Sequence, residues 1–254
     1  MALLVKHITL ADQIKCGERI KMIDHTRKGE KIGYFKMLLG FFSILLMTAM
    51  ILFLAGRINY WQGWVFGGVT ALILLVKSIF FPDRSDLFQE RIKPGPGTKW
   101  WDKVFYAFYI PAFFAVIIIG SLDGGRFGWT ASLPVFVYIS GYILYIFSIS
   151  IFLWAQQINR FFSSVVRIQH DRGHEVIQTG PYKYVRHPGY IGGVLMAIST
   201  ALVLGSLWAL IPAGVVAILL IIRTYLEDIT LQKELPGYAQ YVKTVRYRLL
   251  PGIW

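Results

Sequence analysis

Apolar residues form long stretches in this chain, and polar residues gather between them. Six stretches are almost wholly apolar: 34–55, 61–81, 104–122, 132–155, 190–205 and 207–225. An α-helix of about 20 apolar residues is long enough to cross the hydrocarbon core of a bilayer. The pattern therefore predicts an all-α fold, a polytopic membrane bundle of about six transmembrane helices.

The last two predicted helices lie very close together in the sequence. Only Gly205 and Ser206 separate their apolar interiors, which predicts a tight antiparallel helical hairpin. The first of the two, 190–205, would be about 24 Å long at 1.5 Å per residue, whereas the hydrocarbon core is about 30 Å thick. We therefore expect its polar end to lie deep in the membrane interface.

Composition and charge agree with a membrane protein. Of the 254 residues, 56% are hydrophobic and 16% are charged, and the formal net charge is +12. Lys and Arg are concentrated before the first stretch and in every second connection after it. This alternation follows the positive-inside rule and predicts that both termini are cytosolic. It accounts for the positive charge without a nucleic-acid partner.

The same pattern divides the chain into three regions. Residues 1–33 form a basic cytosolic arm, 34–155 a four-helix transmembrane region, and 156–254 a polar loop, the helical hairpin and a C-terminal tail. The single cysteine, Cys16, cannot form an intramolecular disulfide. No histidine spacing suggests a metal site.

The polar segment 159–193 is where we expect the chemistry. Proline at position 188 favours an extended backbone at His187 and can occupy the first turn of the following helix. The first amides of that helix, together with Arg186, would attract an anion. Gly189, Gly192 and Gly193 would allow another backbone or a ligand to approach closely.

Two motifs in this region resemble those of a known family. Gly180-Pro181-Tyr182 and Arg186-His187-Pro188-Gly189-Tyr190-Ile191-Gly192 are similar to the GxY and RHPxYxG signature of the isoprenylcysteine carboxyl methyltransferase family. Further on, Arg223, Glu227 and Asp228 are similar to its R-x-x-x-E-E motif, with Asp228 in place of the second glutamate. The resemblance covers about residues 159–254.

The resemblance implies an enzyme, an integral membrane methyltransferase that uses S-adenosylmethionine at the cytosolic face. Arg223 and Glu227 are four residues apart, so they would share one helix face, and we expect them to be the catalytic residues: Arg223 orients an anionic acceptor, and Glu227 balances the positive charge of the donor or of Arg223. The alternative is a purely structural i,i+4 pair. The chain contains no G-x-G-x-x-G fingerprint. The residues that the resemblance assigns to the donor, with the C-terminal tail, are His174, Gly180, Tyr182, Arg186, His187, Pro188, Tyr190, Gly192 and Tyr241.

The acceptor is expected to be lipophilic or lipid-anchored and to enter from the bilayer, since the donor is soluble and the site lies among membrane helices. A carboxylate such as a prenylated cysteine is the first expectation. Phospholipid N-methyltransferases resemble the same signature, so an amine acceptor is the alternative, with Glu227 as the base. A small transporter is a third interpretation, but the spans before position 223 contain no Asp or Glu. A sterol-type reductase is a fourth, and it would bind a nicotinamide.

Overall fold

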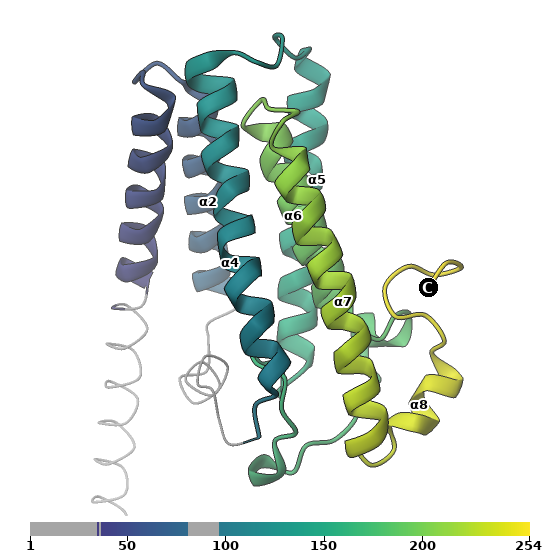
Figure 1. Cartoon of the computed structure of the whole chain (residues 1–254). Helices are drawn as coiled ribbons and strands as arrows, with labels where there is room; N and C mark the ends of the chain where they lie inside the picture. Colours follow the sequence, from purple (N-terminus) through teal and green to yellow (C-terminus); the bar gives the residue numbers. More distant parts are fainter. Residues whose placement is uncertain (1–34, 36, 81–96) are drawn as a thin grey trace, which may run out of the picture.

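The computed structural model describes residue 35 and residues 37–80 and 97–254, and these residues are entirely helical or irregular, without a strand (Figure 1). The predicted all-α bundle is thereby confirmed. The elements are a helix Met37–Ala55, α2 Trp61–Phe80, α4 Trp100–Ser121 continued by the π-helix η1 Leu122–Phe127, α5 Val135–Ile158, the 3₁₀ turns η2 His170–Arg172 and η3 Gly180–Lys183, α6 Pro188–Val203, α7 Leu210–Glu234 and α8 Tyr238–Thr244.

Five helices among the described residues are long and apolar enough to cross a membrane: Met37–Ala55, α2, α4 with η1, α5 and α7. The fifth predicted helix, 190–205, corresponds to α6, which has 16 residues and is shorter than these five. Large apolar side chains remain exposed on the outer helix faces, among them Phe53 at 80%, Phe136 at 67% and Ile143 at 65%. Exposed apolar belts of this kind are what a lipid-facing surface requires.

The boundaries of α6 and α7 differ from those of the last two predicted helices. α6 begins at Pro188, in the first turn as expected, and ends at Val203. α7 begins only at Leu210, where the Ser206 hydroxyl accepts the amide of Ala209 at 3.0 Å. It then continues to Glu234, past the predicted end at 225, because polar residues that end an apolar stretch still favour helix.

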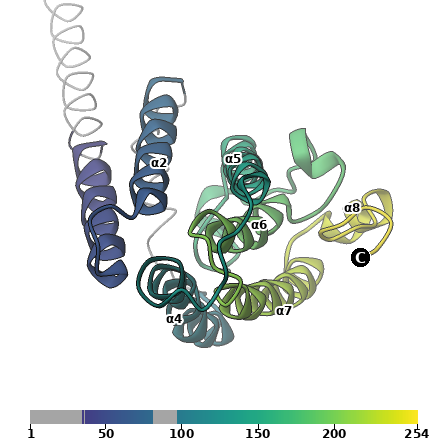
Figure 2. The ribbon, with the colours of Figure 1, turned by 90° about the horizontal axis from the view of Figure 1, so that it is seen from above.

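α6 lies between α5 and α7 and packs closely on α5 (Figure 2). A Cβ added to Gly192 would lie 2.7 Å from the carbonyl oxygen of Ser148 in α5, so the glycine permits this contact. α4 packs against α7 on the other side. The helix Met37–Ala55 and α2 form a separate pair beside this group (Figure 2).

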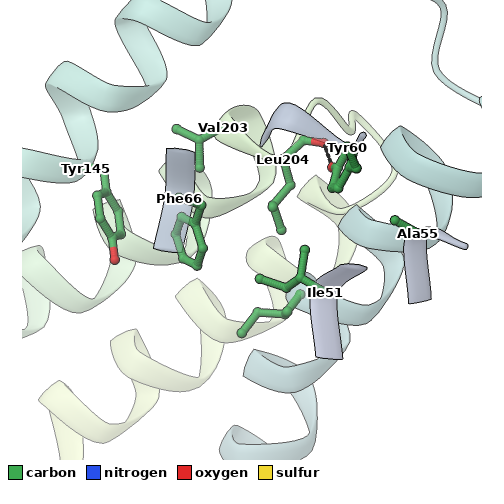
Figure 3. Close-up of a cluster of buried hydrophobic side chains, with 8 residues drawn as sticks. Ile51, Ala55, Tyr60, Phe66, Tyr145, Val203 and Leu204 are labelled. Atoms are coloured by element: carbon green, nitrogen blue, oxygen red, sulfur yellow. Dashed lines mark hydrogen bonds between the residues drawn. The ribbon is translucent and has the colours of Figure 1, made fainter. Parts of the chain in front are cut away.

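A buried apolar cluster joins that pair to the rest of the bundle at the end that carries the α6–α7 turn, here called the turn end (Figure 3). The Tyr60 hydroxyl donates to the carbonyl oxygen of Leu204 (Figure 3). Asp123, fully buried in η1, accepts the amide of Thr130 at 2.7 Å and the hydroxyl of Ser206 at 2.5 Å. The turn end is therefore a closed, packed structure.

The predicted cytosolic arm 1–33, with Cys16, lies outside the described residues, as does the basic segment 82–96. Their predicted placement stays a prediction.

Candidate functional site

A cavity of about 360 Å³ lies at the other end of the bundle, here called the cavity end. Its walls come from α4, α5, the loop after α5, α6, α7 and α8, so residues far apart in sequence meet there. One part of the wall is apolar and lies among the membrane helices, with Tyr109, Phe152, Met196 and Leu220. Another part is polar and is formed by the loop and the C-terminal tail. A cavity of this size is typical of a small-molecule site.

The loop after α5 is held in shape by the buried side chain of Gln169. Its amide group donates to the carbonyl oxygen of Phe161 at 2.7 Å, and its oxygen accepts from Arg172 at 2.7 Å. The backbone amide of Gln169 donates to Nδ1 of His174 at 3.3 Å. The loop therefore presents Phe161 and His174 to the cavity as a pair of tilted rings in contact, with ring centroids 4.5 Å apart.

His174 is expected to stay neutral at physiological pH. Burial, and to a smaller extent the positive charges of His170, Arg167 and Arg172, together lower its pKa from 6.5 to about 4. With Nδ1 accepting a hydrogen bond, the ring proton of the neutral form belongs on Nε2. His174 can therefore act as a neutral hydrogen-bond donor toward a ligand.

Asp228 forms a buried hub under the site. Its carboxylate, fully inaccessible, accepts two parallel hydrogen bonds from Arg186, each 2.8 Å long. It also lies 3.2 Å from Nε2 of His187 and accepts the Tyr238 hydroxyl at 3.0 Å. Burial and then the charge of Asp228 raise the pKa of Tyr238, which stays protonated. Arg248 adds a further contact at 2.9 Å.

Arg186 is thus held by the protein itself. Its remaining terminal nitrogen, NH1, donates to the carbonyl oxygens of Val245 and Arg246 at 2.8 and 2.7 Å, which ties the segment just before α6 to the tail. We expected Arg186 to attract an anion, and in the structure it binds the carboxylate of the protein's own Asp228. Arg186 and His187 still line the cavity, so both can shape a ligand site while anchoring the tail.

Tyr190 joins the two separated motifs. Its hydroxyl donates to Glu227 in α7, and its ring stacks on His187 with centroids 5.8 Å apart. Both Tyr190 and Glu227 line the cavity. On the tail side, the Tyr241 hydroxyl donates to the carbonyl oxygen of Tyr182 at 2.6 Å, and these two residues also line it.

Arg223 lies on the same face of α7 as Glu227 and has several partners of its own. Its guanidinium is 3.0 Å from Asp102 at Nε, an ion pair without hydrogen-bond alignment, and NH2 donates to the other Asp102 oxygen at 3.3 Å. NH1 donates to the Tyr106 hydroxyl at 3.1 Å, and NH2 also donates to the carbonyl oxygen of Ser164 at 2.5 Å. Both charged side chains are nearly inaccessible.

Three of the predicted donor-binding residues do not line the cavity: Gly180, Pro188 and Gly192. Gly180 adopts a left-handed conformation, with φ of +59°, where the chain turns under Trp154 and Ile158. Pro188 begins α6, and Gly192 faces α5. Their geometry gives them structural roles next to the site.

Several site residues were missed by the sequence prediction. Asp102, Tyr106 and Gln169 are among them. Asp102 was missed because a single acidic residue before an apolar stretch resembles an ordinary first-turn aspartate. One sequence feature could have indicated the cavity wall. Aromatic residues cluster in 105–113 and 161–162, and polar residues lie next to them in the sequence. Among the described residues, no group of three His, Cys, Asp or Glu side chains could hold a metal ion.

Residues 141–233 match the isoprenylcysteine carboxyl methyltransferase (ICMT) family. The predicted resemblance is confirmed over these residues, which include α6, most of α7 and the loop of the site. A search of curated proteins finds no match. The family match and the apolar helices together support an integral membrane methyltransferase.

Proposed function

We propose that this relative of the ICMT family transfers a methyl group from S-adenosylmethionine to the carboxylate of a lipophilic acceptor. The observation that carries the proposal is the contact between Tyr190 and Glu227, which joins both motifs at one cavity wall. The same cavity is also lined by Tyr109, Phe152 and Met196, which belong to the membrane helices. Charged lining residues suit a soluble donor, and apolar lining residues suit a lipophilic acceptor.

The polar residues that line the cavity fit the donor chemically. S-adenosylmethionine would supply an electrophilic methyl group on a positively charged sulfur. Glu227 provides a carboxylate to face that charge, and His174 provides a neutral donor for its polar groups. Aromatic rings of Phe161, Phe162 and Tyr241 line the cavity and offer surfaces on which a purine can stack.

Carboxyl methylation needs little from the protein beyond alignment. A carboxyl group with a pKa of about 4 is already ionised at neutral pH, so no base has to remove a proton. Arg223 is fixed by three partners and lines the cavity, so it can orient the acceptor carboxylate without moving. Holding two reactants in line can lower the barrier by about 7 to 11 kcal/mol.

An amine acceptor is the second candidate, because Glu227 faces the cavity and could accept a proton. The pH dependence of turnover distinguishes the two. A rate that is flat above pH 6 indicates an acceptor that is already anionic, whereas a rate that rises from pH 7 to 9 indicates an amine.

The direct test is to incubate the purified protein with labelled methyl donor and a total membrane lipid extract, and to identify the labelled product. Calorimetry with S-adenosylmethionine and S-adenosylhomocysteine tests the donor site independently. We expect His187→Ala to weaken donor binding, and Arg223→Ala to lower turnover and spare donor binding. If neither nucleotide binds the wild-type protein, the proposed function is wrong.

A further inference from the structure

We propose that Asp102 is a positioning residue that holds Arg223 away from Glu227 and so keeps the Glu227 carboxylate available to the donor's positive sulfur. The inference rests on the proposed function. Asp102 belongs to α4, outside the residues 141–233 that match the family. It is therefore a contribution of this chain's upstream helices to the site.

The geometry of α7 shows why Arg223 must be held. Arg223 and Glu227 are four residues apart, so they lie one helical turn from each other on the same face, where opposite charges usually pair. Tyr190 lies beside both: its hydroxyl donates to Glu227, and its ring centroid is 5.6 Å from the Arg223 guanidinium. A released Arg223 would thus have Glu227 as the nearest carboxylate on its own helix.

Asp102 competes with this pairing by holding the guanidinium in a buried ion pair. Its carboxylate meets the guanidinium at two nitrogens, and both groups are buried, at 1% and 6% side-chain exposure. Buried charge pairs of this kind are weakened little by solvent. The Tyr106 hydroxyl and the carbonyl oxygen of Ser164 complete the clamp from α4 and the loop.

Asp102 also fixes the loop that covers the site. It accepts the amide of Val166 at 2.8 Å, and the amide of Lys99 donates to the carbonyl oxygen of Val166 at 3.2 Å. An asparagine at 102 can still accept from Val166 through its amide oxygen. The substitution Asp102→Asn therefore removes the charge that holds Arg223 and retains an acceptor for the loop.

The measurement is the preference of the protein for S-adenosylmethionine, whose sulfur is positive, over S-adenosylhomocysteine, whose sulfur is neutral. Calorimetry gives both dissociation constants. We expect Asp102→Asn to lower this preference by about tenfold, the order expected for losing one charge-assisted contact. Glu227→Gln should lower it similarly.

The double variant Asp102→Asn/Arg223→Gln distinguishes positioning from general damage. Without the arginine no cation remains one turn away on α7 to pair with Glu227, so the preference should return toward the wild-type value. A purely structural role for Asp102 predicts the opposite, a second loss added to the first. A double variant no better than Asp102→Asn overturns the proposal.

Asp123→Asn is the matched control. Asp123 is also a buried carboxylate that accepts a loop amide, from Thr130, but it lies at the turn end and does not line the cavity. It should lower thermal stability and leave the nucleotide preference unchanged. An equal loss of preference in Asp123→Asn contradicts the proposal.

If Asp102→Asn cannot be purified, Arg223→Gln and Glu227→Gln decide the matter alone. The first should keep the preference and the second should lose it, and an equal loss in both overturns the proposal. Wild-type protein that binds neither nucleotide would instead refute the proposed function, so the two failures are distinguishable.

Discussion

Asp228 shows at the scale of one residue how the site and the stability of the fold are linked. The sequence left its role open, because aspartate replaces the second glutamate of the family motif. In the structure its carboxylate holds Arg186, Arg248 and the Tyr238 hydroxyl together. A single buried charge therefore connects the segment just before α6, α7 and the C-terminal tail.

We predict that Asp228→Asn strongly destabilises the protein, because it leaves Arg186 buried without its counter-charge. Breaking a buried ion pair from one side costs roughly 3 to 5 kcal/mol. Thermal unfolding in detergent measures the effect. Asp171→Asn is the control, since its ion pair with Arg167 is largely exposed on the aspartate side and worth at most about 1 kcal/mol. Equal melting temperatures for the two variants would contradict the prediction.

We predict that His174 titrates well below an ordinary histidine, because burial and then the neighbouring charges of His170, Arg167 and Arg172 lower its pKa from 6.5 to about 4. The unfolded chain then binds more protons than the folded one between these values. The contribution of His174 to stability is present above about pH 6.5 and is lost as the pH falls toward 4. Histidine-selective NMR titration measures the shift. His170→Gln removes one neighbouring charge and should raise the pKa of His174; an unchanged value would show that His170 exerts no such influence.

At the scale of an element, the contact between α5 and α6 depends on a missing side chain. We predict that Gly192→Ala forces the helices apart, because the new Cβ would lie 2.7 Å from the backbone oxygen of Ser148, which cannot rotate away. Overpacking of this kind costs about 1 to 3 kcal/mol. Gly214→Ala in α7 is the control, since its Cβ would meet nothing within 4 Å. Thermal unfolding of both variants should show a loss only for Gly192→Ala.

The start of α6 could be predicted from sequence because its cause is local. Pro188 restricts the backbone of His187 and fits the first helical turn, whatever the rest of the chain does. The end of α7 could not be placed the same way. Leu231 in its last turns and the following Leu235 pack with Tyr238 of the tail. The length of an apolar stretch gives no information about such tertiary contacts.

The site was predictable where a motif carried it and not where distant segments meet. Tyr190 and Glu227 were both expected near the donor, and the structure brings them into contact. The pairing of Arg223 with Asp102 joins residues 121 positions apart, and no local pattern indicates it. The sequence suggested Glu227 as the residue that balances the charge of the donor or of Arg223. In the structure the ion-pair partner of Arg223 is Asp102.

At the scale of the whole molecule, the described helices separate two chemically different ends. The turn end is closed by hydrogen bonds, in which the hydroxyls of Thr130 and Ser206 donate to the carboxylate of Asp123. The cavity end carries the loop after α5 with Arg160, Arg167 and Arg172. The positive-inside rule assigns such a loop to the cytosol.

We predict that α5 crosses the membrane with its beginning outside and its end in the cytosol. In a Cys16→Ser background, Ser132→Cys before α5 and Asp171→Cys after it provide exposed positions at opposite ends of the helix. A membrane-impermeant maleimide should modify Ser132→Cys in intact cells and Asp171→Cys only after permeabilisation. Modification of both in intact cells would mean that α5 does not span the membrane.

If Asp171→Cys is modified in intact cells and Ser132→Cys only after permeabilisation, α5 still spans the membrane but in the opposite orientation. That orientation would place the cavity on the outer side, away from the cytosol. The proposed methyl donor is charged and soluble, so it would have to reach the site from the cytosol without crossing the hydrocarbon core. The cavity lies at the Asp171 end of α5, since Phe161 and His174 of the same loop line it. Cytosolic labelling of Asp171→Cys is therefore the orientation in which donor and site can meet.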